Sequence, residues 1–322
     1  MSSKARQLAD LGNQIDDGAI TGTNIIVNGA MTISQRGVYT TATSVSDNNY
    51  YLDRWKVWSG ISATLEHFVT NQPNNSLLTK SARLTATASA TSDLRLVQPI
   101  EFPTSYGGQT MTLSAWIKTN STNCRMYFYN DAYSTNTESA PVSNDEEWHY
   151  TTLTIDVASG LANFIPVIGI DGSSSAQVAI SSGDYFEITG VCLNVGDSAI
   201  AFPHESYGDT LAKCQRYYHR IQRSGQSPIV ASGTRYSAAE CYFAFPLPVR
   251  MRAVPSLSYS SMPRVYYAGG SDQAAANFLI DNNASGEQAL RLRADTPSRT
   301  AGQATWMQVY NAGDHISFDA EL

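Results

Sequence analysis

Aromatic and polar side chains that alternate along short segments are the residues of this sequence best suited to binding a ligand. In the segment CRMYFY, Met126 and Phe128 alternate with Arg125, Tyr127 and Tyr129. Successive side chains of a strand point to opposite faces, so Arg125, Tyr127 and Tyr129 would form one row facing away from the core. Aromatic faces stack on the C–H surfaces of sugar rings, and polar groups bond the ring hydroxyls. The row is therefore a candidate carbohydrate site, unless another chain or a loop covers it.

The segment TMTLSAWIK has the same alternation and contributes a further candidate. Its apolar residues, Leu113, Ala115 and Ile117, are expected to point inward. This alternation places Trp116 on the polar face. Trp116 is then either a stacking platform or a ring capped by a side chain of a neighbouring strand. Trp55 and Trp58 are expected to be core or seam residues.

Three tyrosines in the C-terminal third form a rival candidate site. Tyr259, Tyr266 and Tyr267 lie in or beside connections rich in Gly and Ser. Exposed aromatic side chains on loops are typical recognition elements. The receptor site is therefore expected either on the row around Tyr127 or on these loops.

Enzymatic and metal-binding motifs are weak in this sequence. We therefore expect that the protein is not an enzyme and that it binds no cofactor. Hydrolysis of a glycoside needs two carboxylates placed across one bond, whereas Asp145, Glu146 and Glu147 are adjacent and their side chains diverge. The five histidines form no HExxH motif, and no GxSxG motif occurs in a usable context. Four acidic residues could be ligands of a structural Ca²⁺, but their spacing is not that of an EF-hand. They are Asp156, Asp171, Asp184 and Glu187. The four cysteines form no CxxC pair and are expected to be buried and reduced.

Composition excludes several classes of partner. The 322 residues are only 15% charged, carry a formal net charge of −7 and include 18 tyrosines. An acidic chain without a cluster of Lys and Arg is not expected to bind nucleic acid. No run approaches the ~20 consecutive apolar residues of a membrane span, and the N-terminus has no apolar run typical of a secretory signal.

The elements that must position these residues are strands. Ten or so short apolar or alternating runs, separated by Asn, Gly, Ser and Asp clusters, predict a jelly-roll β-sandwich over residues 25–205. Residues 206–221 predict a helix, which makes 206–224 a linking segment. Strands resume over 225–322 and predict a smaller C-terminal β-sandwich. The polar residues 1–24 are expected to be an anchoring or oligomer-contact segment.

Several ordered motifs resemble those of one family. They are IVNGAMTISQRG from Ile26 followed by YLDRW, ITGV from Ile188 followed by FP, SYG from Ser206 followed by CQRYY, and then FAFP and MRAVP. In this order they resemble bacteriophage tail-fibre and receptor-binding proteins with a jelly roll similar to carbohydrate-binding modules. The likeness covers nearly the whole chain after residue 24. Cys192 stands where the family usually has Gln.

The resemblance implies a virion protein, assembled in the host cytoplasm, that forms a homotrimer. It further implies that residues 1–24 contact other tail proteins and that the chain binds a host surface polysaccharide. Three hypotheses follow: a tail fibre that adsorbs to host glycan, a structural fibre, baseplate or head-fibre component without its own receptor site, and a capsule depolymerase.

Overall fold

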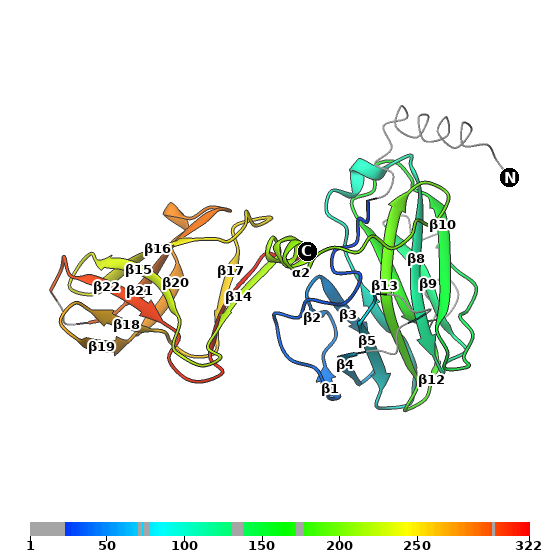
Figure 1. The fold of residues 1–322 in the computed structure, drawn as a ribbon, viewed down its shortest axis with the longest axis horizontal. Coiled ribbons are helices and arrows are strands. Elements are labelled where there is room, and N and C mark those ends of the chain that lie inside the picture. Colours follow the sequence, from blue (N-terminus) through cyan, green and yellow to red (C-terminus); the bar gives the residue numbers. More distant parts are fainter. Residues whose placement is uncertain (1–22, 70–72, 74–76, 131–137, 172–176, 298–299) are drawn as a thin grey trace. The chain divides into compact units, whose positions relative to one another are not determined.

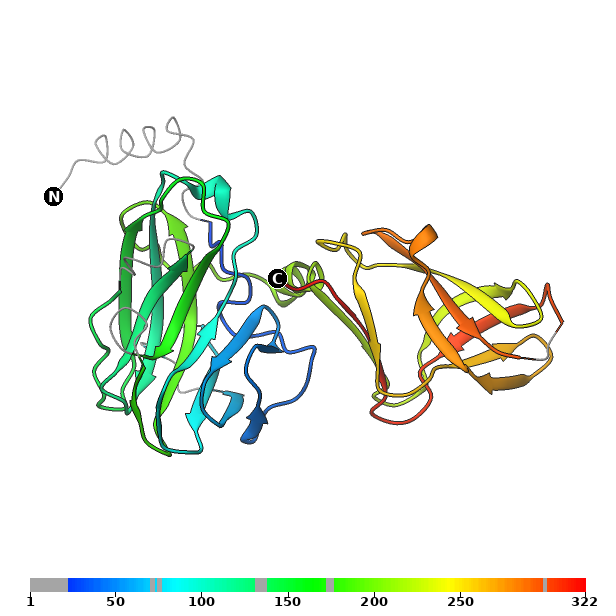
Figure 2. The ribbon, with the colours of Figure 1, turned by 180° about the vertical axis from the view of Figure 1, so that it is seen from behind.

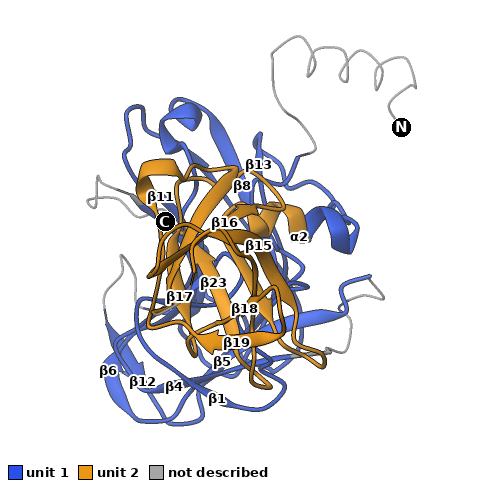
Figure 3. Ribbon diagram, turned by 90° about the vertical axis from the view of Figure 1, so that its left-hand side faces the viewer, with its two compact units in different colours: residues 1–210 blue, residues 211–322 orange. Residues whose placement is uncertain are grey.

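The computed structural model divides into two compact units, residues 1–210 and residues 211–322 (Figure 3). It describes residues 23–69, 73, 77–130, 138–171, 177–297 and 300–322. The predicted N-terminal segment therefore lies almost entirely outside the described residues. Strands dominate both units (Figure 1), and the described part of the chain contains one α-helix, α2 (Tyr207–Gln215). No helix in these ranges is long and apolar enough to cross a membrane.

The first unit is a sandwich of two antiparallel sheets (Figure 2). The six-stranded sheet has the order β1 (Thr43–Val45), β4 (Ala63–Val69), β5 (Lys80–Ala86), β13 (Tyr185–Val195), β8 (Thr110–Thr119) and β10 (His149–Asp156). The five-stranded sheet has the order β2 (Asn49–Leu52), β3 (Trp55–Ser59), β7 (Leu94–Val97), β11 (Phe164–Ile170) and β9 (Cys124–Asn130). A short pair, β6 (Ala90–Ser92) with β12 (Val178–Ile180), and a 3₁₀ turn η2 (Pro103–Tyr106) complete it. The predicted all-β fold of the jelly-roll type is confirmed.

The core of this unit lies between the two sheets and follows the predicted alternation. The inward residues of β8, which include Ile117, and Met126 and Phe128 of β9 are all buried in one apolar cluster. Phe128 stacks on Phe164 of the neighbouring strand, with 4.8 Å between ring centroids. The side chains between them in sequence must therefore lie on the two outer faces of the sandwich.

The motif that begins at Ile26 contacts both sheets of this sandwich, through Trp55 of β3 and Val191 of β13. The Asn28 side chain donates to the carbonyl oxygens of Ile33 and Asp53, and the indole N–H of Trp55 donates to the carbonyl oxygen of Asn28. A Cβ on Gly29 would lie 2.0 Å from the carbonyl oxygen of Val191, so a larger residue does not fit. The residues of this motif therefore build the fold of the first unit.

The second unit is a smaller sandwich. Its three-stranded sheet has the order β14 (Tyr218–Gln222), β23 (His315–Asp319) and β17 (Ser256–Tyr259). Its seven-stranded sheet has the order β19 (Ser271–Ala274), β18 (Arg264–Tyr267), β22 (Ala304–Gln308), β15 (Ile229–Arg235), β16 (Glu240–Pro246), β21 (Ala289–Asp295) and β20 (Asn277–Ile280), with a 3₁₀ turn η4 (Asn282–Ala284). Buried side chains of both sheets form one core.

The linking helix is shorter than predicted, because residues beyond Gln215 join a sheet. β14 pairs with β23 from Tyr218 to Gln222. The Tyr218 hydroxyl donates to the Ser317 hydroxyl at 2.8 Å, and both residues are buried. Backbone pairing and packing thus override the helical spacing of the apolar residues.

His219 on β14 gives the second unit a pH-dependent stability. Its half-buried ring lies 6.3 Å from Phe245 and 6.2 Å from Phe318, and burial lowers its pKa to about 4. As the pH falls, the unfolded chain takes up this proton first, near its ordinary pKa of 6.5, which favours unfolding. Between pH 7 and pH 4 we expect a loss of about 1 to 2 kcal/mol, because the ring retains some contact with solvent.

His219→Phe keeps a ring between the phenylalanines and removes the proton site. Urea unfolding of both proteins at several pH values, followed by the fluorine NMR signal of fluorotryptophan-labelled Trp306, measures the difference. We expect the wild type to lose stability relative to the variant below pH 6.5 and the difference to level off near pH 4. A difference independent of pH contradicts this assignment.

Candidate functional site

The outer face of the five-stranded sheet contains an open cleft of about 370 Å³. We call it the Trp58 cleft; its lining residues are Asp47, Asn48, Trp58, Ser59, Gly60, Asp93, Arg95 and Tyr129. Strands β3, β7 and β9 supply the three large side chains and Ser59. The turns before β2, after β3 and before β7 supply the rest. A concave site with aromatic walls and a few polar groups is typical of small-ligand recognition.

Two aromatic rings form one wall of the cleft. The ring centroids of Trp58 and Tyr129 are 5.2 Å apart, and the rings meet edge to face at 73°. Both side chains are partly exposed and pack on a small apolar cluster that includes Val97 and Val167. The part of each ring that this packing leaves exposed faces the cleft.

Arg95 lies beside these rings in a fixed ion-pair network. Its Nε is 2.7 Å from an oxygen of the fully buried Asp171, and a terminal nitrogen is 3.3 Å from Asp93. The Tyr127 hydroxyl donates to the same Asp171 oxygen at 2.7 Å. Burial acts to lower the pKa of Arg95, but Tyr127 and the two carboxylates outweigh it and raise the pKa. The guanidinium is therefore held charged and in one orientation.

The rim of the cleft is built by backbone bonds to two carboxylates. Asp47 accepts from the backbone N–H of Ser59 at 2.9 Å, and Asp93 accepts from that of Gly60 at 3.2 Å. A Cβ on Gly60 would lie 2.5 Å from the Ser92 hydroxyl, so a larger residue requires the Ser92 side chain to shift. These contacts hold both carboxylates at the mouth of the cleft, where they can accept hydrogen bonds from hydroxyl donors.

The predicted row on β9 faces outward, but only part of it is open. Tyr129 lines the cleft. Tyr127 is 1% exposed, because its hydroxyl is bonded to Asp171 and its backbone bridges to Glu138. Arg125 is buried and 3.1 Å from Glu138. Tyr127 and Arg125 therefore support the site and do not offer surfaces to a ligand.

Trp58 was expected in the core or a seam and instead lines the cleft. Trp55 and Val57 are buried, so the alternation of WKVW places Lys56 and Trp58 on the outer face. That period-2 pattern is the sequence signal that could have identified Trp58.

Trp116 lies on the outer face of the other sheet, away from the cleft. It is partly exposed and lies 5.2 Å from the ring of Tyr150, tilted by 50°. The ring also lies over Gly190, where a Cβ would be 3.2 Å from the indole. Trp116 is thus partly capped by a neighbouring strand, which was one of the two expectations.

The three C-terminal tyrosines lie in strands and have different environments. Tyr267 is 1% exposed and bonded to Thr296, and Tyr259 packs against Phe278 at 5.5 Å. Tyr266 stacks on Trp306 at 5.6 Å and 9°. We call Tyr266 and Trp306 the C-terminal aromatic pair.

Several of the acidic residues named as possible metal ligands or catalytic groups bond other side chains. Asp171 belongs to the Arg95 network, and Glu187 accepts from Ser81 and pairs with Arg83 at 2.8 Å. Asp145 bonds His149 in an exposed turn, which lowers the pKa of its carboxyl to about 2. Among the described residues no group of three or more His, Cys, Asp and Glu side chains is placed to hold a metal ion. All four cysteines are buried and form no disulfide, as predicted.

Fold and site together define an all-β jelly-roll protein with an aromatic-lined cleft on one sheet. No family model and no curated protein matches the chain. Among solved structures it is similar to the enzymatically active domain of tailspike protein 4 of bacteriophage CBA120, with 14% identity over 54% of this chain and 21% of that one and a TM-score of 0.36. The chain therefore spans about a fifth of that structure.

Two carbohydrate-binding structures are also similar. One is a family 61 carbohydrate-binding module in complex with β-1,4-galactotriose, with 12% identity over 54% of this chain and all of that one and a TM-score of 0.33. The other is the N-terminal tandem of family 22 modules from Paenibacillus barcinonensis Xyn10C, with 10% identity over 89% of this chain and 98% of that one and a TM-score of 0.29. The structural neighbours thus include carbohydrate-binding modules and a phage tailspike domain.

Proposed function

We propose that this protein is a phage virion fibre protein that mediates adsorption by binding a glycan of the host surface in the Trp58 cleft. The observation that carries the proposal is the pair of partly exposed rings, Trp58 and Tyr129, beside a fixed Arg95 in an open cleft. The ordered motifs after residue 24 support the virion assignment, a homotrimer, and contacts of residues 1–24 with other tail proteins.

Binding in this cleft combines stacking with hydrogen bonds to sugar hydroxyls. The rings provide apolar area, while the carboxylates of Asp47 and Asp93 accept from hydroxyl groups. An open cleft of this size gives a weak single contact. Several copies on one particle would convert weak contacts into firm attachment.

A glycan array with the purified, assembled protein tests the proposal. We expect binding to a restricted set of oligosaccharides, with each site in the micromolar to millimolar range. Analysis of the bound glycans after incubation should show unchanged chain length, because the proposed activity is binding. No binding by a correctly assembled oligomer contradicts the adhesin proposal, and shortened glycans favour a depolymerase.

The C-terminal aromatic pair is a second candidate contact. It lies on the outer face of the seven-stranded sheet, since its sequence neighbours Thr305 and Met307 are buried. Tyr310 nearby is 40% exposed, with Arg264 4.4 Å from its ring centroid. If this surface adds a contact, Trp306→Ala should lower retention on polysaccharide about fivefold, the effect of losing ~1 kcal/mol.

Affinity electrophoresis in polysaccharide gels measures that retention, and short oligosaccharides provide the control. Oligosaccharides bound in the Trp58 cleft should have unchanged affinity for the Trp306→Ala protein. Retention equal to that of the wild type removes the C-terminal aromatic pair from the binding surface.

A further inference from the structure

We infer that the Trp58 cleft selects uncharged glycans and discriminates against those that carry carboxylate groups. The inference rests on the proposed function and specifies the class of glycan that the same cleft accepts. It follows from the ionised groups around the cleft and from the contacts that already occupy its arginine.

The charges at the cleft are predominantly negative. Asp47 and Asp93 line it, and Asp171 lies fully buried beneath it. Arg95 is the one basic residue among the lining residues. Three carboxylates therefore surround a single guanidinium, and the field at the mouth of the cleft is unfavourable for an anion.

Arg95 is already committed to partners within the protein. Its guanidinium is 2.7 Å from Asp171 on one side and 3.3 Å from Asp93 on the other, and the side chain is only 13% exposed. A ligand carboxylate would have to displace Asp93 to form a comparable pair. The cation that lines the cleft thus orders its walls and is not presented to a ligand.

Other cations on the same outer face have their own partners. Lys56 lies 5.5 Å and Arg36 lies 5.4 Å from the ring centroid of Tyr50 on β2. Arg125 on β9 pairs with Glu138 at 3.1 Å. These basic residues do not line the cleft.

Matched sugars that differ by one charge test the inference. The probe series pairs each neutral hexose oligosaccharide with the uronate oligosaccharide in which the ring hydroxymethyl is a carboxylate. At low salt we expect the uronate to bind about tenfold more weakly, the effect of one added negative charge in a solvated cleft where three carboxylates outnumber one guanidinium. The ratio should shrink at 0.5 M salt, because exposed charges are screened.

Asp47→Asn is the informative variant, because its amide oxygen can still accept from the N–H of Ser59. We expect the ratio of neutral-sugar affinity to uronate affinity to fall about threefold relative to the wild type, because the variant removes one negative charge from the cleft. The affinity for the neutral sugar itself falls to the extent that the Asp47 carboxylate accepts from its hydroxyls. Asp156→Asn, on β10 of the opposite sheet, is the matched control and should leave both affinities unchanged.

The outcomes separate this inference from the proposed function. Equal or tighter binding of the uronate by the wild type, or a ratio unaffected by salt, overturns the selectivity and leaves glycan binding in place. Absence of binding to every neutral and uronate member overturns the proposed function itself. The wild-type comparison decides the question even where a variant does not fold.

Discussion

Replacing Trp58 with alanine is expected to weaken glycan binding at least 30-fold. The indole forms one wall of the cleft, and its partner ring, Tyr129, is 5.2 Å away. Truncation of a central aromatic residue in a binding site costs about 2 kcal/mol or more, which corresponds to this factor. Titration calorimetry or affinity electrophoresis with the best ligand of the array measures the loss.

The matched control is Trp116→Ala. Trp116 is also a partly exposed tryptophan on an outer face, but it lies on the six-stranded sheet. We expect its removal to leave the affinity unchanged. The reverse result, with Trp116→Ala inactive and Trp58→Ala active, would move the site to the other face of the sandwich.

The companion variant Tyr129→Phe distinguishes stacking from hydrogen bonding. It keeps the ring against Trp58 and removes only the hydroxyl. Binding close to that of the wild type is expected if the ring face carries the interaction. A loss as large as that of Trp58→Ala would instead assign the main contact to the hydroxyl.

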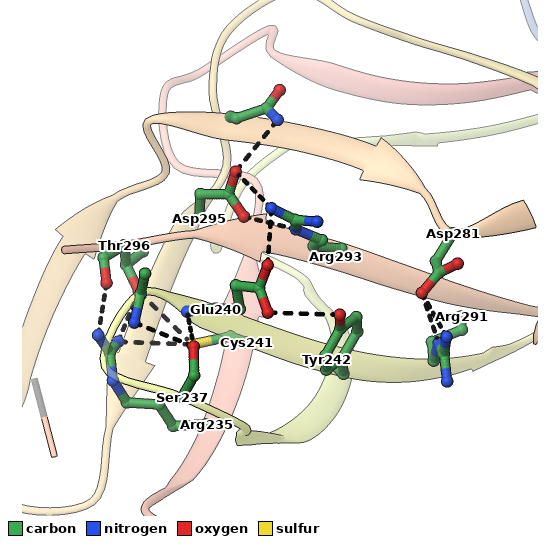
Figure 4. A network of polar contacts seen from close by, with 12 residues as sticks. Arg235, Ser237, Glu240, Cys241, Tyr242, Asp281, Arg291, Arg293, Asp295 and Thr296 are labelled. Carbon is green, nitrogen blue, oxygen red and sulfur yellow. Dashed lines mark hydrogen bonds and ion pairs between the residues drawn. The ribbon is translucent and has the colours of Figure 1, made fainter. Parts of the chain in front are cut away.

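Replacing Arg235 with methionine is expected to destabilise the second unit by about 3–5 kcal/mol, because it leaves buried acceptors without donors. Arg235 is 1% exposed, and Figure 4 shows its guanidinium directed at Thr296 and Cys241. It donates to the hydroxyl of Thr296 at 2.7 Å and to that of Tyr267 at 3.2 Å. The same group donates to the carbonyl oxygens of Thr296 and Ala238.

Each acceptor orphaned in the interior costs about 1–3 kcal/mol. Thr296 and Tyr267 are fully buried, whereas Ala238 lies in an exposed turn where water can replace the guanidinium. Urea unfolding followed by fluorine NMR of the fluorotryptophan-labelled protein resolves Trp306 from the other tryptophans. Its signal reports on this unit, because Trp306 is the one tryptophan in residues 211–322 of the sequence. Glycan binding in the Trp58 cleft belongs to the other unit and should persist in the variant.

Arg293→Met is the control for the loss of an arginine side chain that is not fully buried. Arg293 pairs with Asp295 and Glu240 on the same sheet (Figure 4), but its side chain is 31% exposed. Water can replace those partners, so we expect a much smaller loss of stability than for Arg235→Met. Equal effects of the two substitutions would show that the buried network adds nothing beyond surface ion pairing.

Local sequence patterns were sufficient to predict the strands and the faces of the strands. The alternation in β9 placed Met126 and Phe128 in the core, and both are buried there. The same period placed Tyr129 on an outer face. These predictions hold because side-chain direction in a strand depends only on the parity of the position. The helix was predicted too long, because the partner of Tyr218–Gln222 is β23, almost a hundred residues later.

Whether an outward side chain is open to a ligand was decided only by the tertiary structure. Tyr127 and Tyr129 share a face, yet Tyr127 is covered because Asp171 after β11 accepts its hydroxyl. Trp58 and Tyr129 form one wall although 70 residues separate them in the sequence. The sequence by itself determined an all-β, tyrosine-rich chain with aromatic rows on its sheets. Sheet order and register then selected the ring pair that forms a cleft, because exposure depends on what distant strands and turns place above each side chain.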